Sequence, residues 1–182
     1  MAFSIFSMLE LLIFKFGGNL LRLKMAKRWG CKIGKNCVLS TSLGSEPYLI
    51  EIGDNCSITS NVDLITHDGG NWVLKNLRNF KGTKYGKIVI GNNVYIGTNS
   101  VVLPNVCIGS NCVIGASSVV THNVPSNTVY AGNPAKFICT IDEYYEKCCN
   151  NVGNLENSVF WEDYILMKKS KKDILIKYFQ NK

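Results

Sequence analysis

Only two histidines, His67 and His122, occur among the 182 residues, and they are the side chains best suited to acid–base chemistry near neutral pH. His67 lies in the segment THDGGNW, and His122 lies in VVTHNVP. A histidine can take a proton from an attacking hydroxyl group and later give one to a leaving group. A loop histidine more often only hydrogen-bonds its neighbours, so the residue type alone assigns no chemistry to His67.

Two aspartates lie close enough in the sequence to His67 to act on its imidazole ring. Asp68 follows it directly, and Asp63 precedes it by four positions. Either carboxylate can accept the second ring N–H and so fix the tautomer of the imidazole. The alternative, a solvated acidic loop residue, is the commoner outcome.

Eight cysteines raise the possibilities of a disulfide framework, a metal site and a covalent nucleophile. Cys37, Cys56 and Cys112 recur at one position of a sequence repeat where a small buried side chain is needed, and a free thiol fills that role. There is no C-x-x-C pair, and the adjacent Cys148 and Cys149 have no histidines at zinc-ligand spacing. We therefore predict free thiols, no metal and a reducing compartment, with no cysteine placed beside a base that would activate it.

Positive charge is concentrated near the N-terminus of a chain whose formal net charge is +7. Four basic residues follow an apolar stretch there: Arg22, Lys24, Lys27 and Arg28. This cluster can meet phosphate or an anionic membrane surface, but it also suits an ordinary solvated helix face, which we favour. It has no interleaved aromatic residues and matches no DNA-reading motif, so nucleic acid is not an expected partner.

The apolar segment from Phe3 to Phe16 is interrupted by Glu10 and Lys15 and is shorter than the roughly 20 residues that cross a bilayer. No small-residue cleavage site follows it. We expect residues 1–30 to form an amphipathic helical segment that stays in the mature protein and packs on its own domain or on a neighbouring subunit. Peripheral membrane contact through this segment is the alternative.

A six-residue repeat organises the middle of the chain and predicts its architecture. Aliphatic β-branched residues recur at every sixth position, at Ile90, Ile96, Val102, Ile108, Ile114 and Val120. The residue four positions after each is small: Val94, Ser100, Val106, Cys112, Ser118 and Val124. Both positions can face inward from short strands, while the residues between them turn corners, where glycine and asparagine tolerate positive φ. A helix is excluded, because a period of six does not keep one face at 3.6 residues per turn.

The same repeat extends upstream through IGKNCV and IGDNCS and is interrupted twice. One extra residue lies between Leu39 and Ile52. A longer loop, residues 66–87, follows Leu64 and is rich in charged and aromatic residues. A loop of that length inside a strict repeat is more often functional than idle, and His67 lies at its start.

The run IGNNVYIGTNSVVLPNVCIGSNCVIGASSVV and the closing AGNPAK resemble the hexapeptide-repeat acyltransferases, close to the maltose, galactoside and nodulation-factor O-acetyltransferases. The resemblance covers roughly residues 33–138. It implies a mainly β fold, a left-handed parallel β-helix of about four coils, against the usual crossover handedness, and a homotrimer. The expected parts are the N-terminal helical segment 1–30, the acyltransferase domain 31–138 and a C-terminal helical extension 139–182, with helices over 141–151 and about 158–179.

The resemblance also implies an activity, the transfer of an acetyl group from acetyl-CoA to a sugar hydroxyl. GSEPYLIEIGDN and THDGGNW resemble a branch of the family associated with bacterial surface-polysaccharide biosynthesis. His67 stands where the family has its catalytic base, so we expect it to act in a direct transfer without a covalent enzyme intermediate. The expected location is the cytoplasm or the inner face of its membrane.

Seven residues correspond to family positions that contact the CoA donor: Tyr95, Gly97, Thr98, Ala116, Thr121, His122 and Lys136. The small residues among them would let the pantetheine arm lie close to the coils. His122 stands where close relatives have lysine, so its implied role is donor contact or corner packing. Cys139 stands where close relatives have arginine, which removes one expected phosphate contact.

The acceptor site is expected to use the long loop together with an adjoining subunit. Trp72 and Tyr85 are candidate stacking surfaces for a sugar ring, with Asp68 beside them, although loop aromatics also serve as simple lids. Three basic loop residues, Arg78, Lys81 and Lys84, would favour an anionic acceptor such as a sugar nucleotide or a lipid-linked phosphate. The remaining alternatives are N-acetylation of an amino-sugar nucleotide, O-acetylation of an antibiotic, and an inactive β-helix scaffold.

Overall fold

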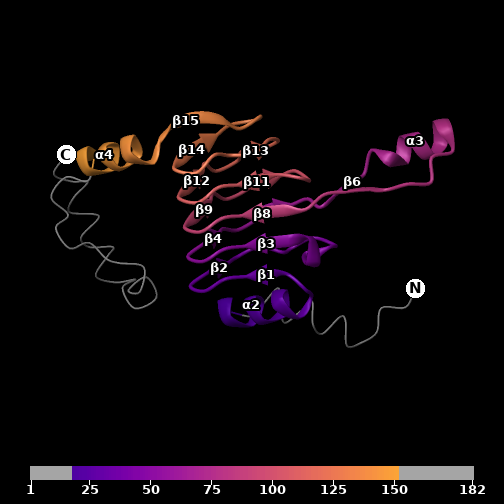
Figure 1. The fold of residues 1–182 in the computed structure, drawn as a ribbon, viewed down its shortest axis with the longest axis horizontal. Helices are drawn as coiled ribbons and strands as arrows, with labels where there is room; N and C mark the ends of the chain where they lie inside the picture. Colours follow the sequence, from indigo (N-terminus) through magenta and orange to yellow (C-terminus); the bar gives the residue numbers. More distant parts are fainter. Residues whose placement is uncertain (1–17, 152–182) are drawn as a thin grey trace, which may run out of the picture. The chain divides into compact units, whose positions relative to one another are not determined.

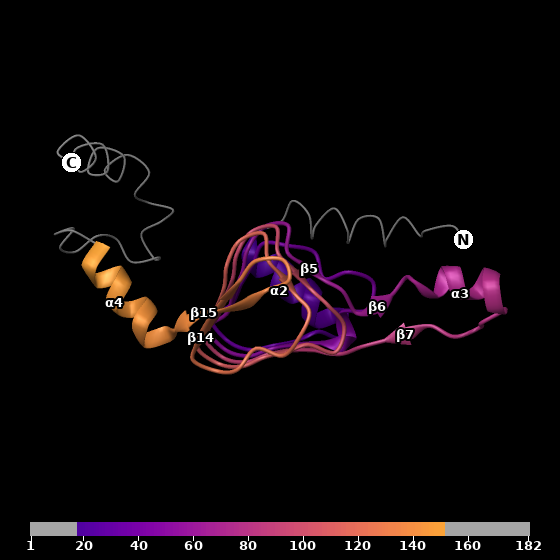
Figure 2. The ribbon, with the colours of Figure 1, turned by 90° about the horizontal axis from the view of Figure 1, so that it is seen from above.

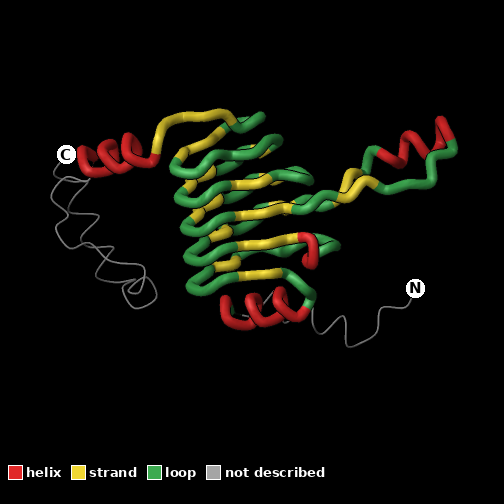
Figure 3. Tube along the Cα trace, viewed as in Figure 1, coloured by secondary structure: helices red, strands yellow, loops and turns green. Residues whose placement is uncertain are grey.

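The hexapeptide repeats form short strands that stack into three parallel sheets, one along each side of a prism (Figures 1 and 3). The computed structural model describes residues 18–151, so the helices expected at Phe3 to Phe16 and at about 158–179 lie outside the described residues. The chain divides into two units, residues 1–145 and 146–182. Figure 2 shows the coils of the first unit end-on, as stacked triangles.

Each sheet collects strands from successive turns of the chain. The first sheet has the order β1 (Lys32–Ile33), β3 (Ile50–Ile52), β8 (Ile88–Ile90), β11 (Cys107–Ile108). The second has β2 (Val38–Leu39), β4 (Ser57–Ile58), β9 (Val94–Ile96), β12 (Cys112–Ile114) and β14 (Thr128–Ala131), with β15 (Lys136–Thr140) antiparallel to β14. The third has β5 (Asp63–Leu64), β10 (Val101–Val102) and β13 (Val119–Val120).

The aliphatic residues of the repeat form vertical columns inside the prism, as the six-residue period predicts. In the first sheet the register pairs Ile33 with Ile52, Ile52 with Ile90, and Ile90 with Ile108. The corresponding columns of the other sheets are Leu39, Ile58, Ile96 and Ile114, and Leu64, Val102 and Val120. All of these side chains are buried, because each hexad directs one large aliphatic residue to the axis.

Asparagine, rather than glycine, supplies the positive φ at the corners of the coils. Asn93 and Asn111 have φ of 55° and 56°, and the amide Nδ2 of Asn93 donates a hydrogen bond to Asn111 Oδ1 at 2.9 Å. The hexad glycines tolerate positive φ but do not adopt it: in the described residues positive φ among glycines is confined to Gly30, Gly44 and Gly132.

The hexad glycines are required because successive coils approach each other closely at these positions. A Cβ added at Gly109 would lie 2.5 Å from the backbone nitrogen of Ser126 in the next coil. By contrast, nothing lies within 4 Å of a Cβ added at Gly69. The absent side chain therefore permits the coil spacing.

The same substitution at these two glycines is expected to have opposite outcomes. Gly109→Ala should lower the free energy of unfolding by about 1–3 kcal/mol or more, because the backbone of the next coil must move. Gly69→Ala should change it by less than about 0.5 kcal/mol. Urea denaturation monitored by circular dichroism measures both, and equal effects would contradict the close-approach explanation.

A helix covers the N-terminal end of the coils. Helix α2 (Asn19–Arg28) lies against the first coil and buries Ala26 (Figure 1). The Asn19 side chain accepts a hydrogen bond from Leu39 N–H at 2.8 Å and donates one to Cys37 O at 2.9 Å, which satisfies the open edge of β2.

Helix α4 (Ile141–Asn151) begins directly after β15, where the sequence predicted a helix. Thr140 and Glu143 form a capping box at its start: Glu143 N–H donates to Thr140 Oγ1, and Thr140 N–H donates to Glu143 Oε2. None of the helices in the described part of the chain is both long and apolar enough to cross a membrane.

Candidate active site

His67 lies where the chain leaves the prism to form a long excursion between the third and the first sheets. Strand β6 (His67–Asp68) pairs antiparallel with β7 (Lys84–Tyr85), and His67 is opposite Tyr85 in this ladder. Directly before it, the carbonyl of the buried Thr66 accepts a hydrogen bond from Gly86 N–H at 2.8 Å. The two ends of the excursion are thereby joined to each other beside the buried Thr66, which fixes the backbone at His67.

Glu46 holds the imidazole of His67. The distance between His67 Nδ1 and Glu46 Oε2 is 2.9 Å, and the same carboxylate oxygen accepts a hydrogen bond from Thr66 Oγ1. A carboxylate can only accept, so Nδ1 carries the proton and Nε2 is the basic nitrogen. Glu46 precedes the 3₁₀ helix η1 (Pro47–Leu49) and is buried, whereas the His67 side chain is 41% exposed.

The interpretation that Asp68 or Asp63 orients the imidazole is wrong. Successive residues of a strand point to opposite sides, and the exposed Asp68 caps the next turn by accepting a hydrogen bond from Gly70 N–H at 2.8 Å. Asp63 is an exposed residue of β5. The sequence analysis missed Glu46, although its signal was present as the extra residue between Leu39 and Ile52, which lets the chain bulge out there.

A hollow of about 340 Å³, lined by both polar and apolar residues, adjoins His67. Tyr85 closes one side of the imidazole, with the two ring centroids 6.2 Å apart in an edge-to-face arrangement. The hollow is lined by Ser42, Gly44, Ser45, Asp63, Leu64, Ile65, Thr66 and His67. Its hydroxyl and carboxylate groups suit a ligand that carries hydroxyl groups, beside a base that can deprotonate one of them.

This chain is similar in sequence and in fold to known proteins. Residues 87–122 match the family model described as bacterial transferase hexapeptide (six repeats). The chain is 48% identical over 129 residues to protein CapG of Staphylococcus aureus, an alignment that covers 69% of this chain and 74% of CapG. The chain belongs to the hexapeptide-repeat acyltransferase family.

Further members of the hexapeptide-repeat family give the fold and the reaction type. Galactoside O-acetyltransferase of Escherichia coli (strain K12) is 42% identical over 121 residues, which cover 63% of this chain and 58% of that protein. A structure of galactoside acetyltransferase in complex with coenzyme A aligns with a TM-score of 0.57 at 29% identity, over 76% of this chain and 80% of that one. The structure of a polySia-specific acetyltransferase, NeuO, aligns with a TM-score of 0.51 at 32% identity, over 59% of this chain and 47% of that one. The prism is therefore the left-handed β-helix of the family.

The predicted donor-contact residues lie at two corners of this hexapeptide-repeat prism. Gly97, Thr98 and Ala116 follow β9 and β12, at the corner that leads to the third sheet, and the exposed Tyr95 lies on β9. A Cβ at Gly97 would lie 2.5 Å from Ala116 N, so coil stacking already demands this glycine.

The other donor-contact candidates are further along the chain. Thr121 and His122 follow β13, at the corner from which the excursion with His67 leaves after β5, and Thr121 Oγ1 lies 2.7 Å from His122 Nδ1. Lys136 is exposed at the start of β15. Within one chain, His67 and the group around Gly97 therefore occupy different corners.

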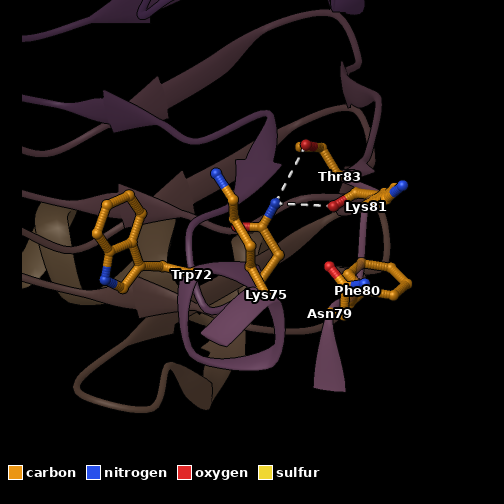
Figure 4. A pocket seen from close by; sticks show the side chains of 8 residues that line it. Trp72, Lys75, Asn79, Phe80, Lys81 and Thr83 are labelled. Carbon is orange, nitrogen blue, oxygen red and sulfur yellow. Dashed lines mark hydrogen bonds between the residues drawn. The ribbon is translucent and has the colours of Figure 1, made fainter. Parts of the chain in front are cut away.

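The predicted acceptor aromatics are separated by the excursion. Tyr85 lies beside His67, whereas Trp72 lies on α3 (Asn71–Arg78), at the far end of the excursion (Figures 1 and 2). Trp72 faces a second hollow of about 470 Å³ (Figure 4), lined by Asn71, Trp72, Lys75, Asn79, Phe80, Lys81, Gly82 and Thr83. Asn71 Nδ2 donates hydrogen bonds to Gly82 O and Thr83 Oγ1, which close this loop.

The cysteines of the repeat are inside the prism, as predicted. Cys37, Cys56 and Cys112 are buried. Burial raises the pKa of Cys56 to about 11 and, with a smaller contribution from Glu51, that of Cys31 to about 12. These two thiols remain protonated at neutral pH, so they are poor nucleophiles.

The carboxyl group of Glu46 is an ion in the folded protein. Burial raises its pKa, but the hydrogen bonds from Thr66 and His67 and the neighbouring imidazole outweigh burial, so the pKa lies below the ordinary value of 4.5. A carboxyl whose pKa is lower in the folded than in the unfolded chain stabilises the fold above its unfolded-state pKa. That contribution is lost as the pH falls through the folded-state pKa.

Glu46→Gln is therefore expected to lower the free energy of unfolding by about 1–3 kcal/mol at neutral pH. The difference from the native chain should shrink as the pH is lowered from 7 toward about 2, because the native carboxyl also loses its charge there. Urea denaturation across this pH range provides the measurement, with the exposed Asp68→Asn as the matched control. A difference that is independent of pH would contradict the ionised Glu46.

Proposed function

We propose that the protein is an acetyl-CoA-dependent O-acetyltransferase that modifies a saccharide hydroxyl, with His67 as general base. The observation that carries the proposal is the Glu46–His67 pair, whose 2.9 Å hydrogen bond directs the basic Nε2 away from the buried carboxylate. The reaction type is that of the family. The saccharide acceptor is supported by relatives whose names specify a galactoside and polySia, and by the hydroxyl and carboxylate groups of Ser42, Ser45 and Asp63 in the lining of the hollow.

The proposed reaction is a direct transfer between two bound substrates. His67 Nε2 takes the proton from the acceptor hydroxyl as its oxygen attacks the thioester carbonyl carbon. The tetrahedral intermediate then collapses, the carbon–sulfur bond breaks, and the imidazolium returns its proton to the sulfur. The products are the acetyl ester and free CoA, and no thiol of the protein takes part.

Glu46 acts as a positioning residue in this scheme. Its carboxylate holds the Nδ1–H tautomer and stabilises the imidazolium that forms during attack. The hydrogen bond from Thr66 anchors Glu46 in turn. Because Glu46 and Thr66 are buried, the arrangement is in place before substrate binds.

The donor is proposed to bind along Tyr95, Gly97, Thr98, Ala116, Thr121, His122 and Lys136 in a homotrimer of 31–138 domains with about four coils each. A neighbouring subunit would bring the corner at Gly97 to the corner at His67, which one chain keeps apart. Sedimentation equilibrium tests this assembly, and a monomer that is fully active would contradict it.

The resemblance of GSEPYLIEIGDN and THDGGNW to a polysaccharide-biosynthesis branch supports an acceptor from surface-polysaccharide assembly. Free thiols at Cys37, Cys56 and Cys112 favour a reducing compartment, so we place the reaction in the cytoplasm.

The deciding experiment measures acetyl transfer from acetyl-CoA to neutral saccharides, sugar nucleotides and amino-sugar nucleotides, with mass spectrometry of the products. Ester formation on a sugar hydroxyl supports the proposal, and amide formation points to N-acetylation. Absence of acetyl-CoA binding by calorimetry would instead indicate an inactive scaffold.

A further inference from the structure

The excursion between Thr66 and Gly86 is an arm that carries an amphipathic helix away from the coils. We define the arm as residues 67–85: β6 and β7 form its stem, and α3 lies at its far end (Figures 1 and 2). Helix α3 buries none of its residues, and Trp72 and Leu77 are 70% and 72% exposed. A helix with an apolar stripe normally buries that stripe, so the apolar side of α3 is suited to a surface outside its own chain.

The aliphatic residues of α3 gather on one side of its axis. At 3.6 residues per turn, Val73, Leu74 and Leu77 fall on one contiguous side. Lys75 falls on the opposite side together with Trp72, and Arg78 borders the aliphatic side next to Leu74. Phe80, just after the helix, adds a 44% exposed aromatic ring.

Beyond Asp68, the charged residues of the arm are all positive. Residues 69–85 contain no acidic residue and four basic ones: Lys75, Arg78, Lys81 and Lys84. Lys75 Nζ lies 5.9 Å from the Trp72 ring centroid, so these two side chains contact each other on the polar side of α3 (Figure 4). A helix with aliphatic residues on one side and basic residues on the other is typical of helices that lie in a membrane interface, where each basic residue gains free energy from anionic lipid.

We infer that the arm docks on the surface of a bilayer that contains anionic phospholipid. Val73, Leu74 and Leu77 enter the headgroup boundary, while Arg78, Lys81 and Lys84 reach the lipid phosphates and Lys75 adds positive charge from the polar side of α3. Charge complementarity selects this occupant, because a purely apolar protein surface would leave four cations without counter-charge. The docking does not depend on acyl transfer; if the proposed function also holds, it brings His67, at the root of the arm, close to acceptors held at the membrane.

The test is co-sedimentation of the full chain with vesicles of phosphatidylcholine alone or with phosphatidylglycerol. Binding should require the anionic lipid and weaken as salt is raised. The double variant Lys75→Gln, Lys81→Gln should lower the apparent affinity at least about tenfold. The matched control Lys24→Gln, Lys27→Gln removes the same charge from exposed residues of α2 and should bind as the native chain does.

A second variant tests the apolar contribution. Leu74→Ser with Leu77→Ser changes two exposed side chains of the apolar side, so the fold should be retained, and its binding to the same vesicles should also fall at least about tenfold. Light scattering is run in parallel on the native chain and on this variant. The inference is overturned if native protein does not bind anionic vesicles, if the α2 control loses binding while the arm variants keep it, or if the serine variant only changes the oligomeric state, which would show that a second copy covers α3.

Discussion

His67→Ala is expected to lower kcat for acetyl transfer by roughly 10²–10⁴-fold while the affinity for CoA is unchanged. The substitution removes the nitrogen that takes the hydroxyl proton, and the coils that line the proposed donor site do not depend on it. Steady-state kinetics with a saccharide acceptor, together with calorimetric titration of CoA, separates the two quantities. Glu46 and Thr66 keep their hydrogen bond in this variant, so the local fold should survive.

The second histidine provides the contrast for this experiment. His122 is exposed and follows β13, among the proposed donor contacts, and its Nδ1 lies beside Thr121 Oγ1. His122→Ala should therefore raise the KM for acetyl-CoA more than it lowers kcat. Unchanged turnover in His67→Ala would remove the central assignment, and so would a kcat loss in His122→Ala as large as the one at His67.

Ile108→Ala is expected to lower the free energy of unfolding by about 2–5 kcal/mol, the largest effect on stability predicted here. Ile108 has no exposed surface and stacks on Ile90 in the column that also holds Ile33 and Ile52. Removing its side chain opens a cavity between coils that the neighbouring rigid turns cannot fill.

The adjacent residue is a matched control for this prediction. Cys107 precedes Ile108 on β11 and faces outward, so it is exposed. Cys107→Ala should change the free energy of unfolding by less than about 0.5 kcal/mol. Chemical denaturation of both variants gives the comparison, and similar losses at positions 107 and 108 would be incompatible with the inward and outward alternation.

Several features of the site became visible only in three dimensions. Trp72 and Tyr85 are both aromatic residues of one loop, yet pairing of β6 with β7 leaves Tyr85 beside His67 and carries Trp72 to the far end of the arm. The separation follows from the antiparallel ladder, which extends the loop instead of folding it over the prism. The sequence NWVLKNLR already indicates that α3 is amphipathic, but only the structure shows that none of its residues is buried.

The sequence by itself determined the prism, the residues that face its axis and the place where the chain leaves it. The period of six places an inward-facing residue at the same position of every hexad, as Ile96 and Ser100 illustrate. These residues can therefore be identified from the local sequence, without knowledge of contacts between distant residues. Tertiary structure alone decided the partner of His67, which is Glu46, 21 positions earlier and on a bulge of the preceding coil. It also decided why Gly109 must lack a side chain. The Glu46–His67 contact and the close approach at Gly109 both depend on how one coil stacks on the next. That stacking arises from contacts between residues that the six-residue period does not relate.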